Sequence, residues 1–293
     1  NGAVKDTCRT KFGFREWGWD GPEFKLNGIP WHGRADLVMN SAGEPDDAAG
    51  IWKRHGQTMV RFWNTTWGGL GMQETLDYHD ATGTPVRRSC IFDGEMASYG
   101  LTERITGEDG TQQTVARKAL FDNWIHRLKA WVRGERNHPS VFIWSLENEI
   151  VFINSRNLGT LKYVEPEITR AARDVMTLDP TRPVMVDGGR ALTDQSLPVN
   201  GCHYEEAAVR EYPDEAYELN TIHNLSGWQP WPMATNKPMV FGEAFFANGH
   251  PPGWYAAVMG DAAFLGRAEA RYGVGLFTKI LSEGYRWYGV GAF

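Results

Sequence analysis

Short apolar runs recur along the chain, and several of them stop abruptly at polar residues. The clearest apolar run spans residues 141–146, which are rich in β-branched and aromatic side chains. It is followed at once by Glu147, Asn148 and Glu149. A run of this kind predicts a strand buried on both faces, as in a parallel sheet covered by helices. Carboxylates are costly to bury there unless they have partners or a function, so this strand end is a candidate site.

Similar runs predict further strands, separated by stretches with helical periodicity. The clearest helix covers residues 111–134, where an apolar stripe of Leu120, Trp124, Leu128 and Trp131 ends at Gly134. Other helices are expected at residues 75–81 and 165–178 and before residue 55, and a loop is expected from residue 150 to 163. The predicted strands are residues 30–37, 57–64, 85–92, 141–146, 183–186, 199–203, 237–243 and 286–293.

This alternation of strands and helices is typical of a (β/α)8 TIM barrel of the α/β class, and 293 residues suit one such domain. Before it, residues 12–28 show a hairpin pattern with turns at Gly21 and at Asn27-Gly28. We therefore divide the chain into a β lead-in segment, residues 1–29, and a barrel, residues 30–293.

Composition excludes several functions. A net charge of −6 argues against a nucleic-acid partner. No apolar run approaches the ~20 residues of a membrane helix, so no membrane partner is expected. The three cysteines form neither a metal-ligand pattern nor a disulfide framework. The compartment stays open, with a slight preference for an extracellular or periplasmic location.

Thirteen tryptophans are an unusual number for one domain. Some are expected in the core, because aromatic rings bury a large area. Others stand beside glycine and asparagine in loop-like stretches, where flat rings suit the apolar faces of sugars. These are Trp63, Trp67, Trp228, Trp231 and Trp254.

The stretch from residue 137 to 149, NHPSVFIWSLENE, resembles the acid/base strand of glycoside hydrolase family 2, the β-galactosidase and β-glucuronidase group. The resemblance implies that Glu149 is the general acid/base and that Asn148 holds the sugar 2-hydroxyl. Glu147 stands where the family has glycine, and we expect it to crowd Glu149. The alternative is a strand end whose acids face solvent or pair with arginines.

Residues 237–243, KPMVFGE, resemble the family's nucleophile strand, which implies that Glu243 is the nucleophile. Gly242 departs from the usual small polar residue, and Ala244 from an aromatic one. The alternative is a rim carboxylate paired with Arg61. Arg61 itself matches an arginine that lies near the nucleophile in the family, where an opposite charge keeps a carboxylate ionised; a structural ion pair inside the barrel is the other interpretation.

Three further strand ends supply candidate substrate-binding residues. Asn64 follows Arg61 in the second strand, and Glu95 follows the third strand. At the sixth strand end, either His203 or Tyr204 could take the place of the family residue that hydrogen-bonds the nucleophile, and Tyr204 is preferred.

The resemblance implies a retaining hydrolase of β-glycosides that needs no cofactor and no metal. The alternatives are an endo-acting polysaccharide hydrolase of the same barrel clan, of mannanase or agarase type, and a non-catalytic carbohydrate-binding barrel. The lead-in, with its FGFRE and LNG segments, also resembles the family's connection to an upstream domain. We therefore expect β-sandwich domains before residue 1, and a barrel truncated after its eighth strand with a closing helix beyond residue 293.

Overall fold

The structure is a computed structural model of the 293-residue chain. It describes residues 12–33, 35–36, 58–62, 72–89, 92–94, 100–203, 234–243 and 290–291, with residues 2, 4 and 6–8 near the start. For Glu243 it describes the backbone. Several predicted features lie outside the described residues: Trp63, Asn64, Trp67, Glu95, Tyr204, the loop tryptophans after residue 220 and the helix before residue 55.

Within the described ranges, parallel strands form two sheets whose edge strands contact each other. One sheet has the order β10-β9-β6-β5-β4 and the other the order β11-β12-β13. Strand β10 contacts β11, and β13 contacts β4, so the strands form the wall of a barrel. The strands are β4 (Ala35–Asp36), β5 (Met59–Phe62), β6 (Val86–Ser89), β9 (Val141–Asn148), β10 (Val184–Asp187), β11 (Asn200–His203), β12 (Met239–Glu243) and β13 (Val290–Gly291).

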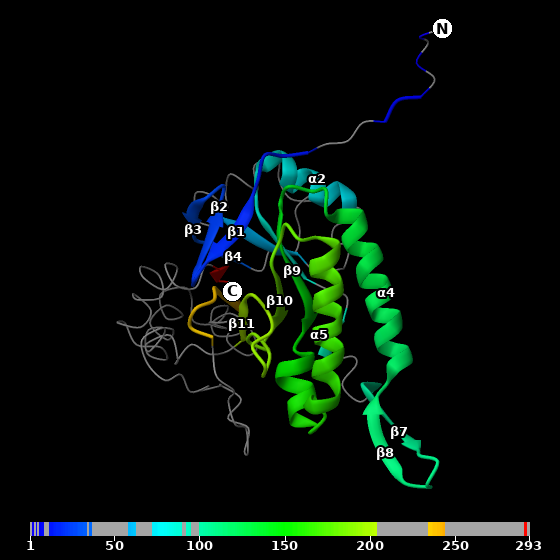
Figure 1. The fold of residues 1–293 in the computed structure, drawn as a ribbon. Coiled ribbons are helices and arrows are strands. Elements are labelled where there is room, and N and C mark those ends of the chain that lie inside the picture. The colour runs from blue at the N-terminus through cyan, green and yellow to red at the C-terminus, as the bar shows by residue number, and fades with distance from the viewer. Residues whose placement is uncertain are drawn as a thin grey trace, which may run out of the picture.

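Amphipathic helices cover the outside of this wall. Helices α4 (Lys118–Glu135) and α5 (Leu161–Leu178) lie side by side against β9 and β10 (Figure 1), while α2 (Met72–Thr82) follows β5. The predicted stripe on α4 is confirmed: Trp124 and Leu128 are buried, and Leu120 and Trp131 pack partly buried against the same core. None of the described helices is long and apolar enough to span a membrane.

A small antiparallel sheet packs at the start of β9. It consists of β1 (Trp17–Asp20), β2 (Glu23–Leu26) and β3 (Ile29–Trp31). Trp17, Phe24 and Trp31 all contact the Phe142 ring, with centroids 5.1, 5.7 and 5.2 Å away. This cluster continues into the barrel interior through Met59, Ile143, Met185, Val199 and Val240. The sheet therefore closes the end of the barrel at which the parallel strands begin.

Three predicted boundaries are wrong. Residues 111–117 do not begin the helix, because β7 (Thr102–Thr106) and β8 (Gln112–Ala116) form a hairpin before it, and α4 continues past Gly134. The interval predicted as a loop after Glu149 begins with a π-helix, η2 (Ile150–Ser155). The predicted first barrel strand starts too early, since β3 belongs to the small sheet and β4 is the strand that pairs with β5.

Candidate functional site

The chain makes a sharp turn at Glu149, where β9 gives way to η2. Asn148 still follows the sheet, and its N–H donates to the carbonyl of Phe92 at 3.0 Å. Glu149 has φ of 59°, in the left-handed region that non-glycine residues rarely adopt. Its N–H donates to the Asp187 carbonyl at 2.9 Å, and its carbonyl accepts from the Asn154 N–H at 3.1 Å. Neighbouring elements thus hold an uncommon backbone conformation at the predicted acid/base residue.

Glu147 supports the same turn from within. Its side chain is wholly buried, and its Oε2 atom accepts from the Ile150 N–H, the first of η2, at 2.5 Å. Burial raises the pKa of Glu147 well above its usual range, against the smaller opposing effect of that backbone hydrogen bond. The Glu147 carboxyl thus engages the start of η2, whereas the sequence led us to expect that it crowds Glu149.

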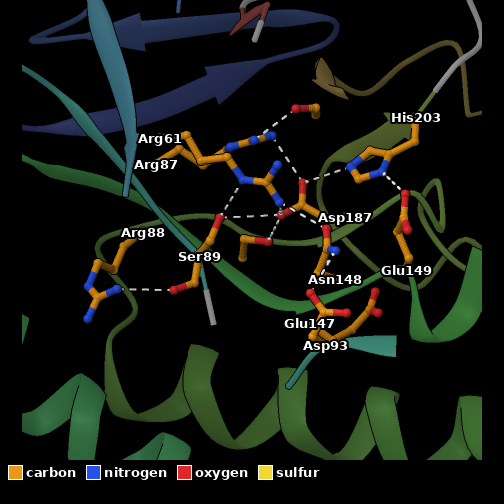
Figure 2. Close-up of polar contacts among 12 residues, drawn as sticks. Arg61, Arg87, Arg88, Ser89, Asp93, Glu147, Asn148, Glu149, Asp187 and His203 are labelled. Atoms are coloured by element: carbon orange, nitrogen blue, oxygen red, sulfur yellow. Dashed lines mark hydrogen bonds and ion pairs between the residues drawn. The ribbon is translucent and has the colours of Figure 1, made fainter. Parts of the chain in front are cut away.

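His203 links the end of β11 to Glu149. The ring is fully buried, with Nδ1 2.9 Å from Oε1 of Glu149 and Nε2 3.4 Å from Oδ1 of Asp187. Figure 2 shows the imidazole between these two carboxyl groups. His203 was one of two candidates for the partner of the nucleophile, with Tyr204 preferred; its described side-chain contacts include the predicted acid/base.

Asp187 is the centre of the buried polar network in Figure 2. Its Oδ1 atom accepts from Arg87 at 3.0 Å, and its Oδ2 atom accepts from Arg61 at 3.2 Å and from the Ser145 hydroxyl at 2.5 Å. Burial alone would raise the pKa of Asp187, but Arg87, Arg61 and His203 hold it well below the usual range. Asp187 is therefore ionised at neutral pH.

The Asn148 amide is oriented by partners on both sides. Arg61 donates to its Oδ1 atom at 2.9 Å, and its Nδ2 atom donates to Asp93 at 3.2 Å. Because the arginine is a donor only, the amide oxygen must face Arg61 and the amide nitrogen must face away from it. Arg61 is fixed in turn by Ser89, whose hydroxyl lies 3.0 Å from Nε.

Strand β12 brings the predicted nucleophile position beside His203. In the parallel ladder His203 pairs with Glu243, and the Gly242 carbonyl accepts from Arg87 at 2.9 Å. A side chain at Gly242 would have no room, since a Cβ atom there would lie 2.5 Å from Nε2 of His203 and 2.6 Å from Oδ1 of Asp187. Gly242, which stands where the family has a small polar residue, thus lies directly against the side chains of His203 and Asp187.

The structure brings together four predicted side chains, those of Arg61, Asn148, Glu149 and His203, and the backbone of Glu243. Sequence reasoning did not select the residues that join them, namely Asp187, Arg87, Ser89 and Ser145. One signal was available for Asp187, because it ends a buried apolar strand as Glu149 and Glu243 do.

One group among the described residues could supply three metal ligands, Asp77, Asp80 and His138. It lies before the start of β9, at the opposite end of that strand from Glu149. Its members are already engaged: His138 contacts Asp80 at 2.7 Å and Gln73 at 3.0 Å, and the Ser140 N–H donates to Asp80.

Comparison with known proteins shows the family of the chain. A family model described as the TIM barrel domain of glycosyl hydrolases family 2 matches residues 74–259, more than half of the chain. The chain belongs to this family. The matched residues include β6 through β12, and therefore both carboxylate-ended strands that carried the resemblance.

Similar proteins carry glycosidase names. A protein of Formosa agariphila, provisionally named a beta-glucuronidase, is 27% identical over 188 residues, which cover 61% of this chain and 15% of that protein. A beta-galactosidase of Enterobacter cloacae is 30% identical over 164 residues, covering 54% and 14%. The chain thus spans a small part of the length of these relatives, and the expected sandwich domains and closing helix stay predictions.

Solved structures share the fold. A beta-D-glucuronidase of Dictyoglomus thermophilum aligns with a TM-score of 0.55 at 17% identity, covering 96% of this chain and 47% of that one. A glycosyl hydrolase family 2 member of Bacteroides cellulosilyticus aligns with a TM-score of 0.53 at 17% identity, covering 96% and 30%. These likenesses confirm the predicted α/β TIM-barrel class.

Proposed function

We propose that this domain is the catalytic barrel of a retaining glycoside hydrolase that cleaves β-glycosidic bonds. The observation that carries the proposal is the position of His203, which contacts the Glu149 side chain at 2.9 Å and pairs in register with Glu243. The ends of β9 and β12, which carry Glu149 and Glu243, thereby belong to one barrel mouth, where barrel active sites are built.

The chemistry follows from two carboxyl groups with different tasks. Glu243 attacks the anomeric carbon, while Glu149 gives its proton to the leaving oxygen. In the second step Glu149 accepts a proton from the water that displaces Glu243 and restores the original configuration. The β-glycoside is the substrate, and neither step calls on a cofactor.

Asn148 is assigned to the sugar 2-hydroxyl. Its amide nitrogen carries two hydrogens, of which one is used by Asp93. We assign the second to the substrate, with Arg61 fixing the orientation of the amide. Arg61 is also proposed to favour the ionised form of Glu243, and the substrate-binding assignments of Asn64, Glu95, Trp63, Trp67 and Tyr204 rest on their places in the sequence.

Azide rescue tests the two assignments. A panel of aryl β-glycosides, including β-glucuronides and β-galactosides, first identifies the sugar. Glu243→Ala should lose turnover by several orders of magnitude, and azide should restore it with a glycosyl azide of inverted configuration. Glu149→Ala should form the azide with retained configuration. Full activity in both variants would contradict the site assignment.

A β-linked polysaccharide tested beside this panel separates the alternative functions. Cleavage of a β-linked polysaccharide without cleavage of aryl glycosides would indicate an endo-acting hydrolase of the same barrel clan. Saturable binding of a sugar without turnover would indicate a carbohydrate-binding barrel.

A further inference from the structure

We propose that His203 is a positioning residue for Glu149: fixed by Asp187 and protonated on both nitrogens, it holds Oε1 and stabilises the carboxylate that Glu149 becomes. This inference rests on the proposed role of Glu149 as the acid/base. It adds a three-residue chain, Asp187–His203–Glu149, to the two carboxyls of the proposed mechanism.

The partners of the two ring nitrogens of His203 indicate which of them carries a hydrogen. Nε2 of His203 faces Oδ1 of Asp187, a carboxylate that two arginines keep ionised and that can only accept. Nε2 therefore carries a hydrogen. Nδ1 faces Oε1 of Glu149, which is again an acceptor whenever Glu149 is ionised. A ring that donates to both carboxyls at once is an imidazolium.

The charges around the ring are compatible with a proton there. Asp187 on β10 and Glu149 after β9 face its two nitrogens, and Glu243 is its neighbour on β12. Arg61 and Arg87, from β5 and β6, direct their charges to Asp187 at 3.2 and 3.0 Å. Glu147, on β9, is buried, and its burial raises its pKa well above the usual range. The acidic groups offset the arginines, so an imidazolium has neighbours of opposite charge.

The shape of the site is matched to this ring. Gly242 leaves the space that His203 and Asp187 fill, because a Cβ atom would come within 2.6 Å of both side chains. The imidazole is 0% exposed and has no freedom to leave. Its contact fixes Oε1 of Glu149, and we assign the catalytic proton to Oε2.

The consequence concerns the first chemical step. When Oε2 gives its proton to the leaving oxygen, Glu149 gains a negative charge, and the N–H of Nδ1 stabilises that charge. The imidazolium keeps its own protons throughout, so one proton moves from Glu149 to the leaving group and one returns from water. Without the imidazolium, the charge that forms on Glu149 loses this stabilisation.

His203→Gln tests this role in the full-length protein, because glutamine keeps a neutral donor and removes the charge. The alkaline limb of kcat/KM should move to higher pH, since loss of a neighbouring positive charge raises the pKa of an acid. With a phenyl glycoside of the sugar identified above, kcat/KM should fall by about tenfold or more, within the ~10²–10⁴ that a general acid contributes. A dinitrophenyl glycoside, whose leaving group needs no acid, should lose little.

The outcomes distinguish this inference from the proposed function. If Glu149→Gln hydrolyses the phenyl glycoside normally, the acid/base assignment is wrong. If Glu149→Gln is impaired and His203→Gln loses both substrates equally with an unmoved pH profile, His203 is only structural. His126→Gln, which removes an exposed imidazole from α4, is the matched control.

A second measurement does not depend on turnover. In protein with ¹⁵N-labelled histidine, the His203 signals, assigned by their loss in His203→Gln, should show both nitrogens protonated at neutral pH. Asp187→Asn should change this state. A single protonated nitrogen in the unaltered protein would overturn the proposal.

Discussion

At the scale of single residues, Glu147 is the buried acid whose behaviour the structure predicts most directly. Burial raises its pKa, so the folded protein keeps a proton that the unfolded chain loses above about pH 4.3. Stability is therefore lost as pH rises from that value towards the pKa of the folded state. Each unit of such a difference corresponds to about 1.4 kcal/mol.

We expect Glu147→Gln to become more stable than the unaltered protein as pH rises. Glutamine keeps an oxygen acceptor for the Ile150 N–H and removes the titration. Thermal unfolding followed at pH 4 to 8 should show nearly equal midpoints at the acidic end and a widening advantage for the variant above it. Glu103→Gln, on the exposed face of β7, should show no such trend. A difference independent of pH would mean that Glu147 is ionised in the fold.

The same residues show how far sequence reasoning reaches. Glu149, Asn148 and Glu243 could be selected because each ends a buried apolar run within a long motif. The central role of Asp187 could not, because its cationic partners, Arg61, Arg87 and His203, come from three other strands. Nothing local in the sequence states that these strand ends meet; only barrel closure brings them together.

At the scale of elements, the site depends on how closely the chain after β6 approaches the end of β9. Gly94 lies against this turn, where a Cβ atom would come within 2.9 Å of the Glu149 backbone and 1.9 Å of the Asn154 amide. Backbone cannot give way as a flexible side chain can. The left-handed conformation of Glu149 is thus supported by this contact, as well as by the hydrogen bonds of its N–H to Asp187 and of its carbonyl to Asn154.

Gly94→Ala should therefore destabilise the fold by about 1–3 kcal/mol, the usual cost of overpacking, and should lower kcat. Gly134→Ala is the matched control, since its added Cβ meets nothing within 4 Å and it lies inside α4. There, alanine should stabilise by roughly 0.5–1 kcal/mol through helix propensity. Urea unfolding and aryl glycoside hydrolysis measure both effects. Equal stability and equal kcat of the two variants would contradict the close approach of Gly94 to the Glu149 backbone.

The elements also differ in how visible they are in the sequence. Strand β9 and helix α5 follow clear apolar patterns, and their existence was predicted. Strand β8 of the β7–β8 hairpin was taken as the start of a helix, because its glutamines and threonine do not form the alternating apolar pattern of a half-buried strand. The π-helix after Glu149 is held by Glu147 and by the bonds of Asn154 to the Glu149 carbonyl, which periodicity does not report.

At the scale of the whole molecule, the barrel has a closed end and an end that carries the candidate site. The small sheet β1–β3 fills the closed end, with its aromatic rings on Phe142, and the buried ions collect at the other end of β9. Strand β3 crosses the predicted boundary between the lead-in and the barrel, and the sheet shares a core with β5, β9, β10 and β12. The lead-in therefore packs as part of the barrel core, and its origin in an upstream domain remains a prediction.

Trp17 and Trp19 provide a matched test of this coupling, because they are tryptophans of the same strand that differ in burial. Trp17 is 7% exposed and belongs to the shared core, whereas Trp19 is 43% exposed. Trp17→Ala should lower the free energy of unfolding by about 3–5 kcal/mol, the usual cost of deleting a buried aromatic side chain. Trp19→Ala should cost less than about 1 kcal/mol. If the sheet is part of the barrel, loss of glycosidase activity on heating should move down together with the unfolding midpoint in Trp17→Ala. Activity that persists after the aromatic cluster has melted would show instead that the sheet unfolds as a separate unit, independent of the catalytic mouth.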